Sequence, residues 1–328
     1  MRPTDFAKCL TGFLTAYLPG QQGASLNTIK SYRDTFSILL SYCRDVKLIR
    51  IEKLTLAQFD GKLISDFLMW LETERGNSVS TRNQRLAAIH AFCHYVQTEE
   101  PGALLQCHQI LDIGMKKFKK PHVEYLSAKT LAEILAKPDL NTSNGRRDLV
   151  MLSILYDTGA RVSELIGLKA RDVRLDEFPI VRLDGKGGKI RQVPLMQKTS
   201  AMLRDYMSER DLTARQMLDH PLFFNSRREP FTRPGITYIL KKYTGDLKIT
   251  PHVLRHTKAV HLLQAGVNII YIRDILGHVD LKTTEVYARA DTEMKRKAME
   301  NVYQELIPNA TPSWNNDAGL MEWLHSLV

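Results

Sequence analysis

The sequence predicts a mainly α-helical chain of two domains, with a small antiparallel β-sheet in the second domain. Apolar residues recur with helical spacing through most of residues 25–113. A lysine-rich segment at 114–124 then divides the chain, and its 328 residues exceed the ~100–200 that one domain usually holds. Between about 173 and 195 the pattern changes to alternation and β-branched residues, which is typical of strands.

The first domain, residues 1–113, is expected to be entirely helical. From Ser25 to Val46 the apolar residues follow one another at steps of mostly three and four, which places them on one face of a helix. Breaks are expected at Gly76 and at Pro101-Gly102. The expected helices span 25–46, 63–74, 78–97 and 103–113.

Residues 114–124 form the expected linker. Four lysines fall within five positions around Phe118, which is typical of an exposed, solvated segment. Between two basic domains, such a segment could also lie along a phosphate backbone.

The second domain, residues 125–307, is expected to begin with helices. Ser127 has the character of an N-cap for a helix that reaches about residue 137. Further helices are expected at 145–157 and from 162. Strands are expected at 173–176, 178–185 and 189–195, and the chain is expected to be helical again from 196. Gly185-Lys186-Gly187-Gly188 forms the expected hairpin turn.

Positive charge is spread over both domains. The chain has 46 Lys and Arg against 36 Asp and Glu, a net charge of +10, and the first 120 residues contribute +5 of it. This distribution suits a protein that holds a polyanion with two domains. A basic protein without a nucleic-acid role has the same composition, so charge alone does not decide.

The sequence carries no sign of a membrane or of secretion. It has no run of 18 or more apolar residues, and its start lacks the apolar core of a signal peptide. The cysteines form no C-x-x-C pair and lie in apolar patterns, so we interpret them as reduced core residues: Cys9, Cys43, Cys93 and Cys107. We therefore expect a cytoplasmic protein.

Several kinds of catalytic site find no support in the motifs. The phosphate-binding patterns G-x-x-x-x-G-K-[ST] and G-x-G-x-x-G are absent, as is H-E-x-x-H. No Cys/His set has zinc spacing, and the acidic residues do not cluster as a two-metal nuclease requires. We expect no cofactor and no metal, so an enzyme of this sequence would rely on cations, histidines and hydroxyls.

Five short segments contain such residues in a fixed order. They are Thr158–Leu165, Gly185–Lys189, His252–His256, Leu276–His278 and Thr283–Tyr287. Together they bring arginines, a lysine and histidines that can surround one phosphate, with a tyrosine that can attack it. Arginine guanidinium groups match the geometry of phosphate oxygens, a lysine can protonate the leaving oxygen, and a phosphotyrosine stores the energy of the phosphodiester bond.

Each of these features has a structural explanation as well. Lys186 at a hairpin tip is commonly a solvated side chain. Arg161 can be a surface residue in a first helical turn, and His278 can follow the glycine that caps a helix. Tyr287 alone is commonly a half-buried aromatic. Residues 252–277 also have the pattern of a helix-turn-helix with Gly266 at the turn.

The joint order of these motifs resembles the tyrosine recombinase (phage integrase) family, and its pattern is close to that of the Xer-type recombinases. Residues 252–289, HVLRHTKAVHLLQAGVNIIYIRDILGHVDLKTTEVYAR, are similar to the family's second box. TGARVSEL is similar to its first box and DGKGGKIRQVPL to its β-hairpin. The helical segments that begin at 25 and 78 resemble its core-binding domain more weakly. The resemblance implies an N-terminal core-binding domain and an α+β catalytic domain.

The resemblance also implies roles for six residues. Arg161 and Arg255 would hold the scissile phosphate, Lys186 would be the general acid, and His278 would hydrogen-bond the phosphate. His252 would assist proton transfer at Tyr287, the nucleophile, which would leave a 3′-phosphotyrosine and a free 5′-hydroxyl. We interpret the neighbouring Lys189 as solvated and His256 as structural.

The resemblance implies double-stranded DNA recombination sites as the partner, and therefore a nucleoid-associated protein. The basic residues off the apolar stripes of the first domain, and those of the linker, are the expected DNA contacts: Lys30, Arg33, Arg82, Arg85, Lys117 and Lys119. An accessory recombinase or a DNA-bending protein would be a further partner. A mobile-element recombinase and a housekeeping one remain alternatives, because 41 residues follow Tyr287 and no arm-binding domain precedes residue 25.

The end of the chain, 308–328, predicts a contact between protomers. Residues 308–315 contain two prolines and small polar residues, which predict an extended linker. Asn316 or Asp317 can cap a following helix with one apolar stripe, which can dock on its own domain. The family resemblance instead implies that it packs into a neighbouring protomer of a tetramer, in which strands are exchanged through a Holliday junction. A type IB topoisomerase and a non-catalytic DNA-binding regulator are the alternative functions.

Overall fold

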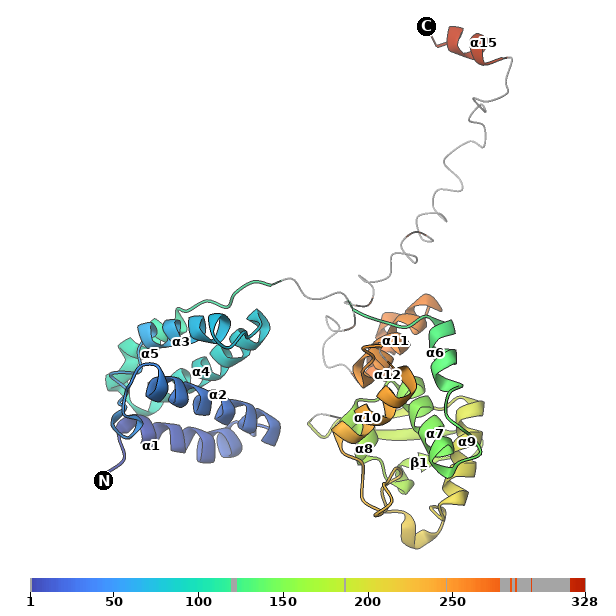
Figure 1. Ribbon diagram of the computed structural model, residues 1–328, viewed down its shortest axis with the longest axis horizontal. Helices are drawn as coiled ribbons and strands as arrows, with labels where there is room; N and C mark the ends of the chain where they lie inside the picture. Colours follow the sequence, from blue (N-terminus) through green and yellow to red (C-terminus); the bar gives the residue numbers. More distant parts are fainter. Residues whose placement is uncertain are drawn as a thin grey trace. The chain divides into compact units, whose positions relative to one another are not determined.

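The computed structural model describes residues 2–118, 123–185, 187–245, 247–277 and 319–327, together with the single residues 284, 287 and 296. The chain divides into two compact units, Met1–Pro121 and His122–Val328 (Figure 1). The boundary falls inside the segment 114–124. The mainly helical character and the small antiparallel sheet in the second unit confirm the fold class that the sequence predicts.

Capping side chains set the starts of the long helices in the first unit. Ser25, Asp60 and Ser78 each accept a hydrogen bond from the backbone N–H three residues further on. The four helices expected here appear as α2, α3, α4 and α5. The elements of this unit are α1 (Asp5–Gly12), the π-helix η1 (Phe13–Gln21), α2 (Leu26–Asp45), η2 (Ile51–Lys53), α3 (Gly61–Thr73), α4 (Val79–Glu99), η3 (Pro101–Ala103) and α5 (Leu104–Leu111).

The helical elements α1 and η1, which precede residue 25, were not predicted. Pro19 lies inside η1 and conceals the helical pattern, because proline lacks the N–H that a helix interior needs. Phe6 of α1 and Phe13 of η1 nevertheless pack on Phe92 of α4, with ring centroids 5.7 and 5.4 Å away. Phe36 of α2 meets the same ring at 5.0 Å. An aromatic cluster thus joins the start of the chain to the core of this unit.

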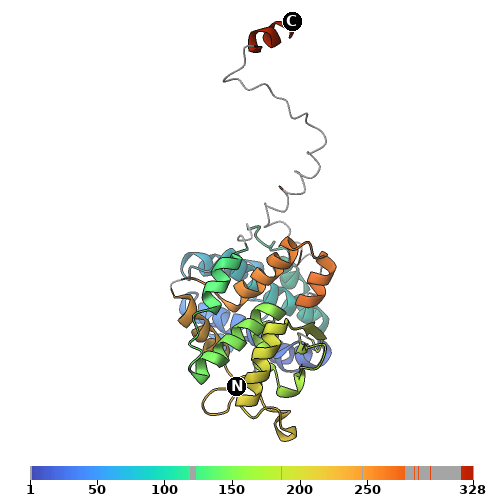
Figure 2. The ribbon, with the colours of Figure 1, turned by 90° about the vertical axis from the view of Figure 1, so that its right-hand side faces the viewer.

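The second unit consists of helices around the small sheet. α7 packs against both α9 and α11 (Figures 1 and 2). The elements are α6 (Ala128–Leu135), α7 (Ser143–Thr158), α8 (Val162–Gly167), η4 (Ala170–Asp172), β1 (Val173–Arg174), β2 (Ile180–Asp184), β3 (Ile190–Pro194), α9 (Gln197–Glu209), η5 (Arg215–Met217), α10 (Arg233–Thr244), α11 (Pro251–Gln264), α12 (Ile269–Leu276) and α15 (Leu320–His325).

The sheet has the order β1-β2-β3, and both pairings are antiparallel. Asp184 pairs with Ile190 at the end of the β2–β3 hairpin, and the Gly185 N–H donates to the Lys189 carbonyl at 2.8 Å. Gly187 and Gly188 have φ values of +76° and +73°, which only glycine adopts readily. The glycine-rich hairpin is therefore confirmed, although Lys186 at its tip lies outside the described residues.

Two glycines with positive φ bring the site segments together. Gly159 ends α7 at φ +57°, so that the chain turns directly into α8. Gly277 ends α12 at φ +64° in the same left-handed conformation. Gly266, with φ +78°, lies between α11 and α12, which pack on each other as the helix-turn-helix pattern predicts.

The four cysteines are buried and unpaired, as predicted. None of the helices in the described part of the chain is long and apolar enough to cross a membrane. Among the same residues, no three His, Cys, Asp or Glu side chains gather as a metal ion would require.

Candidate active site

The corner between α7 and α8 presents Arg161. Its backbone N–H donates to Glu164 Oε2 at 2.7 Å, and its Nη1 donates to Glu164 Oε1 at 2.8 Å. Its Nη2 also reaches the Gly277 carbonyl at 3.2 Å. The side chain remains 30% exposed. Arg161 is therefore held by Glu164 of α8 and by the end of α12, while its side chain remains partly open to solvent.

Arg255 of α11 is buried and is held by neutral acceptors. Its Nη1 donates to the Gly159 carbonyl and its Nη2 to the Leu276 carbonyl, both at 2.6 Å. Burial, with the positive charge of Arg161 nearby, lowers its pKa to about 10, so that it remains charged at neutral pH. Glycine is favoured at position 159 because its φ of +57° is left-handed, and a Cβ would also lie 2.5 Å from Leu276 Cδ2.

The Glu164 carboxylate is shared by two arginines. Arg191 of β3 donates to Oε1 and Oε2 at 2.9 and 2.8 Å, in addition to the bonds from Arg161. Burial alone would raise the pKa of Glu164, but the bonds from Arg191 and Arg161 outweigh it and lower the pKa below its ordinary value. Arg191 also donates from Nε to the Ile275 carbonyl at 2.9 Å. One carboxylate thus links α8, the hairpin and the end of α12.

This cluster has an excess of positive charge. Arg161, Arg191 and Arg255 lie around Glu164, so three positive charges face one negative charge. Guanidinium groups that are already oriented bind phosphate oxygens by charge-assisted, bidentate hydrogen bonds. The cluster is therefore suited to a phosphate group.

Tyr287 lies beside the cluster with its ring buried, 3% exposed. Burial raises the pKa of its phenol, although the charges of Arg255 and Arg161 act in the opposite direction. A hydrogen bond of 2.8 Å joins the Tyr287 hydroxyl to Nδ1 of His256 on α11. His252, one turn earlier on the same helix, is exposed, and its ring centroid is 6.4 Å from that of His256.

The structure thus brings four of the six predicted residues close together: Arg161, His252, Arg255 and Tyr287. Lys186 and His278 lie outside the described residues, but the glycines before them are placed. A Cβ on Gly185 would be 3.4 Å from Glu164 Oε1, and a Cβ on Gly277 would be 3.0 Å from Arg191 Nη1. Gly185 and Gly277, which directly precede Lys186 and His278, therefore both lie against the Glu164–Arg191 ion pair.

Sequence analysis missed three residues of this site. Glu164 and Arg191 form its buried ion pair, and His256, interpreted as structural, meets the tyrosine hydroxyl. Alternation along β3 places Arg191 on the same face as the buried Val193, so an inward-pointing arginine was detectable.

The predicted DNA contacts in the first unit differ in exposure. Lys30 and Arg33 of α2 and Lys117 are exposed, and Arg85 of α4 is half-buried. Lys119 lies outside the described residues.

The placement of Arg82 on the polar side of α4 was wrong. Arg82 is 5% exposed, and it donates to the Gly114 carbonyl at 3.0 Å. Its position four residues before Leu86 puts it on the buried stripe of the helix.

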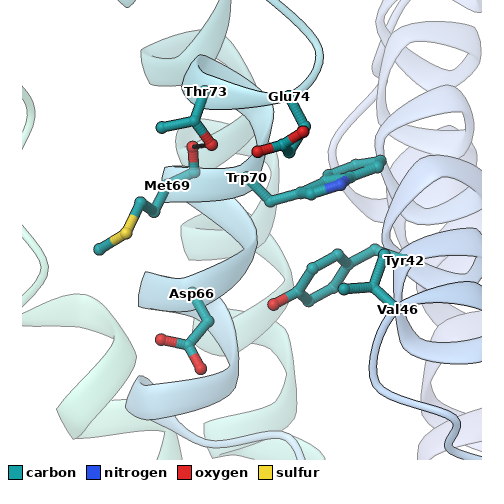
Figure 3. Close-up of a pocket in the computed structure, with 7 residues that line it drawn as sticks. All are labelled: Tyr42, Val46, Asp66, Met69, Trp70, Thr73 and Glu74. Atoms are coloured by element: carbon teal, nitrogen blue, oxygen red, sulfur yellow. Dashed lines mark hydrogen bonds between the residues drawn. The ribbon is translucent and has the colours of Figure 1, made fainter.

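A hollow of about 500 Å³ lies between α2 and α3 of the first unit (Figure 3). The rings of Tyr42 and Trp70 line it, with centroids 5.1 Å apart, and the exposed Met69 forms its rim. The hydroxyl of Thr73 donates to the Met69 carbonyl at 3.2 Å.

Two family models match the chain, and together they cover most of it. The model of the phage integrase family matches residues 124–294, and that of the phage integrase N-terminal SAM-like domain matches residues 11–100. A protein of Sinorhizobium fredii designated an integrase/recombinase, y4rC, is 35% identical over 98% of this chain and 98% of its own length. The tyrosine recombinase XerD of Listeria monocytogenes is 32% identical, over 90% of this chain and 97% of its own.

The chain belongs to the phage integrase family. The resemblance inferred from the motifs is confirmed, and this integrase-family chain is an enzyme of site-specific DNA recombination.

Solved structures share the fold of this integrase-family chain. The site-specific recombinase XerH superposes with a TM-score of 0.67 at 22% identity, covering 91% of this chain and 88% of that one. The integrase of the transposon Tn1549 superposes with a TM-score of 0.66 at 20% identity, covering 90% and 98%. The predicted fold class is confirmed by this likeness.

Replacement of Glu164 by glutamine tests the buried ion pair. We expect Glu164→Gln to lower the free energy of unfolding by about 3–5 kcal/mol, because Arg161 and Arg191 lose the charge that compensates them. Glu209→Gln is the matched control: Glu209 also accepts two bonds from one arginine, Arg146, but in an exposed position. The control should cost less than about 1 kcal/mol in urea unfolding.

Equal losses for the two variants would contradict the role given to Glu164. The pH dependence provides a second check. Because the pKa of Glu164 is lowered by folding, its contribution is complete above the unfolded value of about 4.3 and is lost as the pH falls through the folded value.

Proposed function

We propose that this recombinase cuts and rejoins DNA through a 3′-phosphotyrosine formed on Tyr287, and that a Holliday junction is the intermediate of strand exchange. The observation that carries the proposal is the position of the Tyr287 hydroxyl beside a cluster in which Arg161 and Arg255 are held ready by backbone carbonyls. A phosphoryl-transfer site needs such fixed positive charge more than any other component.

In this proposal Arg161 and Arg255 hold the scissile phosphate. Arg255 uses two of its donors on carbonyl groups, which do not neutralise its charge, so that the full charge acts on the phosphate. The side chain of Arg161 is partly exposed, so in this proposal it is the arginine that the incoming DNA contacts first. The charge that develops on the non-bridging oxygens is stabilised by both groups.

Three further residues complete the proposed reaction. Lys186 protonates the leaving 5′-oxygen, His278 hydrogen-bonds the phosphate, and His252 assists proton transfer at Tyr287. Support for the first two comes from Gly185 and Gly277, which lie against the Glu164–Arg191 pair. His252 is supported by its place one turn before His256 on α11.

We propose that residues 1–113 and 125–307 are the core-binding and catalytic domains, and that both hold the duplex, with 114–124 linking them. Lys30 and Arg85 come together on one hollow of about 280 Å³, formed by α2 and α4, which supports their role as phosphate contacts. Arg33, Lys117 and Lys119 extend this role, whereas Arg82 supports the segment at Gly114. The related structures of XerH and of the Tn1549 integrase are complexes with DNA.

We also propose that four protomers assemble on DNA and exchange the terminal segment 308–328. Within the described part of this segment, α15 carries Trp323, Leu324 and Leu327, which are 37%, 40% and 62% exposed. A helix of this length gains stability only by packing against another surface. An accessory recombinase or DNA-bending protein remains a further proposed partner.

The experiment that tests the function begins with DNA captured covalently on the protein in its native host. The captured site is then placed in a nicked duplex. Cleavage of this duplex releases a short fragment, so the strand is not rejoined and the covalent complex is trapped. We expect Tyr287→Phe to bind this duplex like the wild type, because binding rests on contacts with phosphates. It should form no covalent complex, because the attacking oxygen is missing. Covalent product from the purified variant would exclude Tyr287 as the nucleophile.

Lys186→Ala tests the general acid. We expect cleavage to slow by roughly 10²–10⁴-fold with little loss of affinity, because the leaving oxygen needs a proton only in the transition state. A duplex with sulfur at the bridging 5′ position leaves without that proton, so it should restore most of the rate. If it does not, Lys186 is not the acid, and Lys189 becomes the candidate.

Truncation after Pro308 tests the exchange of the terminal helix. The truncated protein should bind single sites as a monomer but form no tetramers on paired sites in sedimentation experiments. Leu324→Asp in the full chain should act in the same direction, while His325→Asp, on the same exposed helix but outside the apolar stripe, should not. Tetramers of the truncated protein would contradict the proposal.

A further inference from the structure

Two histidines lie one turn apart on α11, and the second of them meets the proposed nucleophile. His256 Nδ1 is 2.8 Å from the Tyr287 hydroxyl, and the two ring centroids are 5.4 Å apart. The His252 ring lies 6.4 Å from the His256 ring and is exposed. The contact with the tyrosine hydroxyl therefore assigns a task to His256 that the family motifs did not suggest.

We propose that His256 is the group that takes the proton from Tyr287 when the tyrosine attacks DNA, and that returns it when the strand is rejoined. The proposal rests on Tyr287 being the nucleophile. His252 then assists from the neighbouring turn and does not take the proton itself.

The proton and bond changes balance in this step. The Tyr287 O–H bond breaks and an N–H bond forms at His256 Nδ1, while the phenolic oxygen forms a bond to phosphorus. The bond from phosphorus to the 5′-oxygen breaks, and that oxygen takes a proton from the general acid. In rejoining, the 5′-hydroxyl attacks the phosphotyrosine and gives its proton back to the general acid that protonated it. The bond from phosphorus to the phenolic oxygen breaks, and the departing phenolate takes its proton back from the His256 imidazolium.

The surroundings keep His256 in the form that can accept. Burial lowers its pKa, and the positive charges that His252 and Arg255 can carry lower it further, so the imidazole is neutral at pH 7. The raised pKa of the buried Tyr287 phenol means that its proton does not leave without an acceptor. Among the described residues, His252 and Arg255 act on His256, and Arg255 and Arg161 act on Tyr287. One step further out, Arg233 acts on His252, and Glu164 and Arg191 act on Arg255.

His256→Asn is the variant that separates proton transfer from packing. An asparagine amide can occupy the position of Nδ1 and keep a hydrogen bond to the hydroxyl, but it cannot take a proton near neutral pH. His261→Asn is the matched control. His261 lies on the same helix, and its Nδ1 is 2.9 Å from the hydroxyl of another half-buried tyrosine, Tyr156.

The experiment measures single-turnover cleavage between pH 5 and 9 on the nicked duplex that carries the captured site, with oxygen and with sulfur at the bridging 5′ position. We expect His256→Asn to slow cleavage by roughly 10²–10⁴-fold on both substrates, because sulfur replaces only the acid. Its rate should rise about tenfold per pH unit, as only the phenolate attacks. The wild type and His261→Asn should instead lose rate only as the pH falls below the ordinary histidine value of about 6.5.

Each alternative outcome overturns the inference. A His256→Asn variant with the wild-type rate and pH profile, or one that the sulfur substrate restores, shows that His256 does not accept the proton. If the fall in cleavage rate at low pH disappears in His252→Asn but persists in His256→Asn, the role of proton acceptor belongs to His252. If His256→Asn does not fold, a wild-type rate on the sulfur substrate that rises about tenfold per pH unit from pH 7 to 9 still excludes the inference, because the phenolate would then attack without a proton acceptor. Failure of the proposed function is recognised separately, since the wild type would then form no covalent complex at all.

Discussion

The buried carboxylate of Glu164 is the interaction on which the rest of the site depends. It joins Arg161 at the start of α8 to Arg191 on β3, and through Arg191 it reaches the Ile275 carbonyl in the last turn of α12. Three segments that are distant in the sequence are thus fixed by one charge. Because they carry or precede the proposed catalytic residues, the distances among those residues follow from this ion pair.

Arg255 illustrates why the cluster is not neutralised. A buried guanidinium group needs hydrogen-bond acceptors, and here the carbonyls of Gly159 and Leu276 provide them without adding negative charge. Both carbonyls are exposed to Arg255 by chain turns, one at the left-handed Gly159 and one before the left-handed Gly277. In the proposed function, a phosphate bound at this cluster would balance the remaining positive charge, so the two left-handed glycines would contribute to phosphate affinity.

Much of this architecture was predictable because it is local. The Ser127 cap, the apolar stripes and the glycine-rich hairpin depend on neighbouring residues, and they placed the main helices and the sheet correctly. The features that were missed depend on tertiary contacts. Arg82 looks like a surface arginine until the Gly114 carbonyl is seen beside it, and His256 acquires its partner from a residue 31 positions away. The periodicity of a sequence describes one helix or strand at a time, so it does not show which residues of other elements pack against that helix or strand.

The measurement that tests the central claim most directly is the identification of the amino acid that carries DNA after cleavage. The trapped covalent complex is digested with nuclease and trypsin, and the nucleotide-bearing peptide is sequenced by mass spectrometry. The account predicts a single modified peptide, residues 283–289, with the phosphate on Tyr287. A phosphate on the peptide 259–273, which contains Tyr271, or on any other residue would contradict it.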